Sequence, residues 1–406
     1  MKMSRRSLLA GVAAVPLAGT RSRVPARRSA TSGSRVIGVS PANDVSWVDA
    51  VSLEPLLGPR LQLPGWWALG VSWDRRRVLL RSYASTPFLL ATADTRHFDQ
   101  SKPFHEGVSS VKGAALAWPH EHRLMIAKDE AYGSPHGLTR VEIVDPTSGK
   151  VAARKNIAAH LAGATSGQRG LLLALSPNQG DSHGPRLALV DWSARVHSLP
   201  LAARSIDTTS DGHEPSATVA LSPDEQTALV GSSHGRMLVN LANGHARSVI
   251  DPGDPITQIT WLDARHALLV TQHSALVLRL ALLDLQTGTR RVIGESSSIP
   301  ATGPSRVAFT PPEGGITTIT ANGRRLSHHV DKTPLSMLYP QAPGRYAMAV
   351  PGSVGLRPGR RIVVDLRTGA LALDKSYIHR PQPSHALANT DPRQQREATW
   401  TMMHEW

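Results

Sequence analysis

The feature that most constrains this chain is one short phrase that recurs along nearly all of its length. The phrase is an apolar strand that ends in Asp, then a turn, and often a Gly four residues after the Asp. An Asp side chain accepts hydrogen bonds from turn N–H groups two residues on, and the Gly supplies a left-handed residue, so each phrase predicts a β-hairpin. The strand of each copy ends at Asp49, Asp145, Asp191, Asp284 or Asp365, and weaker copies contain Asn240 and Asp331.

Hairpins at a period of roughly 45 residues are typical of a β-propeller. We expect an all-β fold over residues 36–406, in which a single propeller is built of four-stranded antiparallel blades. Seven inner strands are expected at residues 69–74, 115–119, 173–178, 219–224, 259–263, 307–311 and 337–340. Eight third strands are expected to end near residues 48, 92, 144, 190, 240, 283, 330 and 364.

The first blade thus lacks an inner strand, and we expect residues 399–403 to take that place and close the ring with a C-terminal strand. This segment is apolar and rich in residues that favour strands. Eight blades is the preferred count. Seven is the alternative, because residues 306–340 can be read as one degenerate blade.

The first 35 residues predict an export signal followed by a linker. Arg5 and Arg6 precede an apolar run that is too short to span a membrane permanently. This arrangement resembles a twin-arginine signal peptide, which we place at residues 1–18. The resemblance implies a periplasmic, cell-envelope or extracellular location. Residues 19–35 are rich in Arg, Ser and Thr and predict a disordered basic linker.

Charge and cysteine content exclude several functions. The chain has a net charge of +14, but its first 35 residues hold eight Lys or Arg and no acid, which leaves +6 for the rest. A charge of +6 spread over the rest of the chain does not make the concentrated basic patch that nucleic-acid binding needs, so we expect no nucleic-acid partner. The absence of Cys excludes disulfides and cysteine nucleophiles. We expect a monomer without an integral membrane segment in the mature chain.

The blade pattern also resembles a known repeat. Residues 45–49, 60–64 and 69–78 together look like the bacterial YVTN-type repeat, a relative of the WD40 and TolB-like propellers. The resemblance implies a ligand face where second and third strands are connected. Propellers of this kind include binding modules, but also lactonases, lyases and quinone-dependent dehydrogenases.

Four successive loops on the expected ligand face contain a histidine, and nearby connections between blades contain further His and acidic residues. The candidates for ligand contact are His136, His183, His234, His273, Asp211, His213, Glu214 and Asp254. Histidine suits metal binding or proton transfer, but ordinary loop residues copied with the repeat are the stronger explanation of the pattern. Equivalent loops also lie too far apart for four rings to share one ion.

No nucleophile, base and orienting group can be assembled from the sequence, so we name no catalytic residue, metal site or cofactor. The interpretation is an exported propeller that binds a protein or a small molecule at its channel face. The alternatives are an enzyme with its site at the channel mouth, and an envelope attachment factor whose basic linker contacts anionic polymers.

Overall fold

The computed structural model describes part of the chain. The described residues are 35–39, 44–49, 51, 54–62, 65–72, 74, 76–82, 89–98, 105–106, 114–120, 122–131, 134–202, 205–207, 215–232, 235–250, 256–274, 277–331, 335–341, 346–351, 359–377 and 385–386. They form eight four-stranded antiparallel sheets. None of these residues belongs to a helix that is long and apolar enough to cross a membrane.

The first four sheets are numbered in chain order, and their strands run from the centre outward. Sheet 1 contains β32 (His385–Ala386), β1 (Arg35–Val39), β2 (Val45–Asp49) and β3 (Pro55–Leu61). Sheet 2 contains β4 (Trp66–Val71), β5 (Arg77–Ser82), β6 (Leu89–Asp94) and β7 (His105–Glu106). Sheet 3 contains β8 (Ala114–His120), β9 (Arg123–Asp129), β10 (Thr139–Val144) and β11 (Val151–Ile157). Sheet 4 contains β12 (His160–Gly167), β13 (Gly170–Ser176), β14 (Arg186–Asp191) and β15 (Val196–Pro200).

The other four sheets follow the same order. Sheet 5 contains β16 (Thr218–Leu221), β17 (Thr227–Ser232), β18 (Gly235–Asn240) and β19 (Ala246–Ile250). Sheet 6 contains β20 (Ile256–Trp261), β21 (His266–Ser274), β22 (Val277–Asp284) and β23 (Arg290–Ser296). Sheet 7 contains β24 (Ala301–Gly303), β25 (Arg306–Phe309), β26 (Ile316–Thr320) and β27 (Arg325–His329). Sheet 8 contains β28 (Leu335–Gln341), β29 (Tyr346–Pro351), β30 (Gly359–Asp365) and β31 (Leu371–Tyr377).

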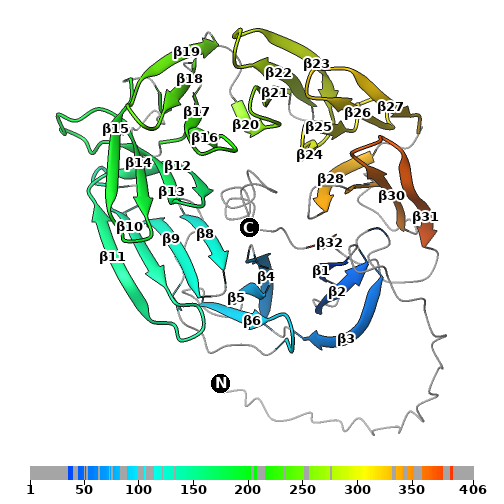
Figure 1. The fold of residues 1–406 in the computed structure, drawn as a ribbon, viewed down its shortest axis with the longest axis horizontal. Coiled ribbons are helices and arrows are strands. Elements are labelled where there is room, and N and C mark those ends of the chain that lie inside the picture. The colour runs from blue at the N-terminus through cyan, green and yellow to red at the C-terminus, as the bar shows by residue number, and fades with distance from the viewer. Residues whose placement is uncertain are drawn as a thin grey trace, which may run out of the picture.

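The sheets lie around a common centre, with the first strand of each nearest the middle and the fourth on the circumference (Figure 1). We call the upper face the side where second strands lead into third strands. On the same side, each outer strand leads to the inner strand of the next sheet. The lower face carries the other turns. This arrangement agrees with the predicted propeller architecture.

The recurring phrase forms the predicted turn between third and fourth strands, except at Asp331, which follows the outer strand β27 and lies between two sheets. At Asp145 the side chain accepts a hydrogen bond from the Thr147 N–H at 2.9 Å, and the Gly149 N–H donates to the Asp145 carbonyl at 2.8 Å. Gly149 has φ = 72°, in the left-handed region that glycine tolerates best. The turns at Asn240, Asp284 and Asp365 repeat this geometry, with φ values of 73°, 74° and 75° at the glycine.

Hydrophobic contacts between neighbouring sheets make up the core. Strand β13 is buried along its whole length, because Leu171 and Leu173 pack toward sheet 3 while Leu172 packs toward sheet 5. An outer strand such as β11 is mostly exposed. Inner and second strands therefore read as continuous apolar runs, whereas outer strands read as polar ones.

Three strand predictions were wrong in position. The segments at residues 173–178 and 307–311 belong to the second strands β13 and β25, and the inner strands are β12 and β24. The segment that ends near residue 330 is the outer strand β27, and the third strand is β26. The physical reason is burial on both faces, which makes inner and second strands look alike. In sheet 7 an Asn-Gly turn also replaces the Asp phrase.

The inner side of β1 pairs with β32 over two residues. Gly38 lies opposite Ala386 and Val39 lies opposite His385, in antiparallel register. The C-terminal part of the chain thus contributes the inner strand of sheet 1 through β32. Residues 399–403, which we predicted for this place, lie outside the described residues.

Candidate functional site

Two of the candidate histidines lie in described loops between second and third strands of neighbouring sheets. His136 lies between β9 and β10, and His183 lies between β13 and β14. Both side chains are exposed on the upper face. His273 is exposed near the end of β21, where that strand turns toward β22.

The loops that contain His136 and His183 are joined to each other. The Gly137 N–H donates to Oδ1 of Asn178 at 2.6 Å, and the Gln179 N–H donates to the carbonyl of Pro135 at 3.3 Å. These bonds connect the β9–β10 loop of sheet 3 to the β13–β14 loop of sheet 4. We call the described residues of these two loops, 130–131 with 134–138 and 177–185, the paired loops. They hold two exposed imidazoles on one ordered surface.

The third described histidine has a different environment. Nη2 of Arg279 lies 2.7 Å from Nδ1 of His273, and Oε1 of Glu295 lies 3.5 Å from Nε2 of the same ring. His273 therefore belongs to a local charged cluster on sheet 6. The described residues contain no group of three or more His, Cys, Asp or Glu side chains that could hold a metal ion.

Several residues singled out from the sequence lie outside the described part of the chain. They are Arg5, Arg6, Asp211, His213, Glu214, His234 and Asp254.

A buried pair beneath the paired loops was not predicted. Asp129 ends β9 and His160 begins β12, so both lie at the upper ends of their strands. Nδ1 of His160 lies 3.0 Å from Oδ2 of Asp129, and the two side chains are 3% and 0% exposed. Asp129 also accepts hydrogen bonds from the Leu161 N–H at 3.2 Å and the Ala131 N–H at 3.1 Å. One carboxylate thus joins sheet 3 to the first residues of sheet 4.

The free nitrogen of His160 gives this pair chemical interest. In a neutral ring, the contact with the Asp129 carboxylate places the proton on Nδ1 and leaves a lone pair on Nε2. Nε2 is buried and has no hydrogen-bond partner among the described residues. A carboxylate that fixes the imidazole in this way is the arrangement that general bases and metal ligands use, although it also serves as a purely structural contact.

Gly137 closes the space over His160. A Cβ at position 137 would lie 2.5 Å from both the backbone N and Nδ1 of His160, which is closer than real Cβ contacts come. The glycine is therefore required by close packing against an imidazole. The matching glycine in the next sheet, Gly184, has only the Leu201 carbonyl oxygen within 4 Å, at 3.9 Å.

These two glycines allow a matched test. Gly137→Ala should lower the free energy of unfolding by about 1 to 3 kcal/mol, because the new methyl group overpacks the His160 site. Gly184→Ala should change it by less than about 0.5 kcal/mol. Urea denaturation of both variants measures the difference. Equal effects would show that the contact with His160 does not constrain position 137.

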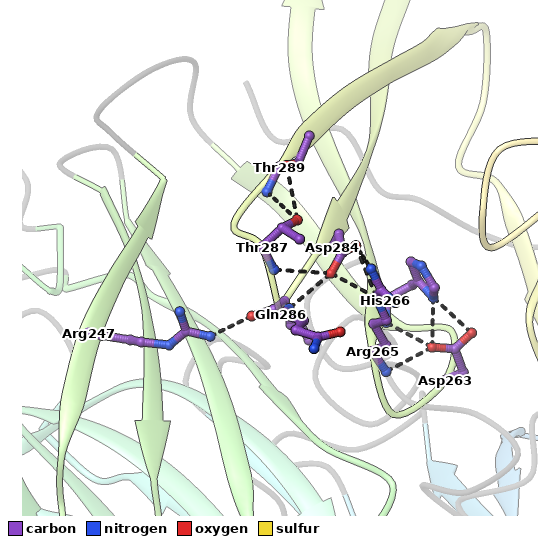
Figure 2. A network of polar contacts seen from close by, with 9 residues as sticks. Arg247, Asp263, Arg265, His266, Asp284, Gln286, Thr287 and Thr289 are labelled. Atoms are coloured by element: carbon purple, nitrogen blue, oxygen red, sulfur yellow. Dashed lines mark hydrogen bonds and ion pairs between the residues drawn. The ribbon is translucent and has the colours of Figure 1, made fainter.

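The lower face contains a second polar network, centred on sheet 6 (Figure 2). Asp284 accepts two hydrogen bonds from Arg265, from Nε at 3.0 Å and from Nη2 at 2.5 Å. The Arg265 guanidinium therefore holds the pKa of Asp284 well below its usual range. Asp263 accepts from the Arg265 N–H at 2.8 Å and lies 2.9 Å from Nδ1 of His266. The carboxylates of Asp263 and Asp284 thus already accept hydrogen bonds from turn N–H groups and from Arg265, which indicates a structural role.

Comparisons with known proteins support the architecture. No family model matches the chain, and no curated protein matches it. A solved structure of dihydro-heme d1 dehydrogenase NirN in complex with DHE is similar over 90% of this chain and 78% of that one, with 14% identity and a TM-score of 0.57. A eukaryotic initiation factor is similar over 88% and 91%, with 13% identity and a TM-score of 0.54. The chain has a β-propeller fold. At these identities, the likeness extends to the fold alone.

Proposed function

We propose that this chain is an exported β-propeller that binds a protein or a small-molecule ligand on its upper face. The observation that carries the proposal is the connection between the paired loops, which presents His136 and His183 on a preorganised surface. Loops held by a rigid scaffold are where binding residues concentrate, and preorganisation lowers the entropic cost of binding. The eight sheets would serve as the blades of a ring closed between β1 and β32.

A photo-crosslinking amino acid at position 183 should form an adduct with the partner in the source cells. The control is the same amino acid at position 226, because Gln226 is exposed in the β16–β17 turn on the lower face. His136→Asn with His183→Asn should reduce binding of the captured partner by about 10-fold, while the melting temperature stays unchanged. Adducts at position 226 but not at 183 would contradict the proposal.

An enzyme is the second candidate, and the buried Asp129–His160 pair favours it. Here Nε2 of His160 would act as a general base at the upper end of an inner strand, in a lactonase-, lyase- or dehydrogenase-like reaction. In His160→Asn the amide nitrogen can replace Nδ1 as the donor to Asp129, but nothing replaces Nε2. Turnover of a lactone or ester by the wild type, lost in this variant at unchanged melting temperature, would support catalysis. Equal turnover by both proteins would exclude it.

The export proposal has a separate test. Arg5→Lys together with Arg6→Lys should leave precursor in the cytoplasm, because the twin-arginine route distinguishes the guanidinium pair from lysine. Fractionation and immunoblotting measure the location. Unchanged export of the double variant would overturn this part of the proposal, while leaving the binding surface untouched.

A further inference from the structure

The outer strands of five successive sheets carry charge of nearly one sign. We call β11, β15, β19, β23 and β27, each with the residue before it, the basic rim. The basic rim contains nine Lys or Arg and a single acidic residue, Glu295. Its cations are Lys150, Arg154, Lys155, Arg195, Arg247, Arg290, Arg291, Arg324 and Arg325, and all nine are exposed. The modest average charge of the chain beyond residue 35 hides this asymmetry.

Among the described residues, most of these nine cations form no ion pair with a neighbouring carboxylate. Arg154 forms an ion pair with Glu142, with Nε 2.6 Å from Oε1. Glu295 lies beside His273 and Arg279, so it is already occupied. Arg291 donates to the carbonyl of Asn322 at 3.4 Å, which leaves its positive charge in place.

Contacts of two arginines join the basic rim across sheets 5, 6 and 7. Nη2 of Arg247 on β19 donates to the carbonyl of Leu285, in the turn that leads into β23 (Figure 2). Arg291 on β23 likewise reaches the turn that leads into β27, where a Cβ on Gly323 would lie 2.8 Å from its Nη1. Each of these two arginines thus lies against the turn before the next basic strand, and the five outer strands follow one another around the circumference (Figure 1).

We propose that the basic rim binds a linear polymer that carries phosphate groups along its length. Seven of the nine cations are arginines, and the guanidinium fork matches phosphate oxygens in two-point contacts. Charged outer strands also protect sheet edges against pairing with other strands. Positive and negative side chains protect an edge equally well, so protection does not explain why nearly all of these charges are positive. Curvature argues for a flexible polymer, since a flat bilayer would touch only one sector of a convex rim. This surface is independent of the ligand face proposed above.

Long-chain polyphosphate, titrated against the full chain at low salt, tests the proposal. Arg290→Gln, Arg324→Gln and Arg325→Gln together should weaken binding by about 10- to 100-fold and flatten the dependence of affinity on salt. The control combines Arg76→Gln, Arg123→Gln and Arg169→Gln, three exposed positions at the turns between first and second strands. It removes the same charge and should bind as the wild type does. Both variants keep the N-terminal arginines, so any contribution of these residues to polyphosphate binding is the same in the two proteins.

Pyrophosphate should bind far more weakly than the long chain, because only a polymer engages several sheets at once. If the two triple variants lose the same affinity for polyphosphate, binding depends only on the net charge of the protein, and the proposal is overturned. Binding of polyglutamate as tightly as polyphosphate would overturn the phosphate preference, and tighter binding to anionic vesicles would overturn the choice of a polymer.

Discussion

Removal of residues 378–406 should give a protein that aggregates or is rapidly degraded, whereas removal of residues 387–406 should leave it folded. Only the longer deletion removes β32, which pairs with Gly38 and Val39 of β1. Without it, β1 loses backbone partners on its inner side, and the contacts of Ile37, which is 3% exposed, become accessible to water. We expect a loss of about 2 to 5 kcal/mol, a large part of the stability of a typical domain.

Thermal unfolding and limited proteolysis of both truncated proteins measure this effect. A variant with His385→Pro and Ala386→Pro in the full-length chain should resemble the longer deletion, since proline cannot donate a ladder hydrogen bond. If the shorter deletion is equally damaging, a segment after Ala386, such as residues 399–403, contributes to closure. If neither deletion matters, the pairing of β1 with β32 does not stabilise the protein.

Asp129→Ala should be among the most destabilising single substitutions in the described part of the chain. The carboxylate accepts hydrogen bonds from His160, Leu161 and Ala131, and its side chain is fully buried. Its removal leaves buried donors without an acceptor at the junction of sheets 3 and 4. Because an unsatisfied buried polar group costs about 1 to 3 kcal/mol, we expect a total loss of about 3 to 5 kcal/mol.

The control for this substitution is Asp145→Ala, at a lower-face turn where the side chain accepts from the Thr147 N–H and from Ser148. Water can replace those contacts, so the expected loss is about 1 kcal/mol or less. Urea unfolding at neutral pH compares the two. Losses of similar size would mean that the Asp129–His160 pair contributes little to stability, which would strengthen the case for a functional role.

The fold was largely predictable because its turns are coded locally. An Asp and a Gly four residues later determine a hairpin without reference to the rest of the chain, and the turns at Asp145, Asp284 and Asp365 confirm this. Strand rank within a sheet was harder to predict. β12 and β13 are both buried along their whole length, so no pattern of exposure tells the inner strand from the second one.

The candidate site was predictable only in part, for a similar reason. His136 and His183 are recognisable because each precedes a glycine in a polar loop. Asp129 and His160 are separated by 31 residues and belong to different sheets, so no local spacing connects them. The available signal was a lone histidine at the head of a strand of otherwise apolar and small residues, together with an Asp at the end of an apolar strand.

The pairing of β1 with β32 also determines when this protein can finish folding. β1 is the first described strand to leave the ribosome and β32 is the last, so β1 waits for nearly the whole chain before its inner edge is covered. Contacts between distant parts of a chain form slowly, and an uncovered strand edge invites association with other chains. Slower translation of the last sheet should therefore lower the yield of soluble protein, even though no residue of the finished molecule is changed.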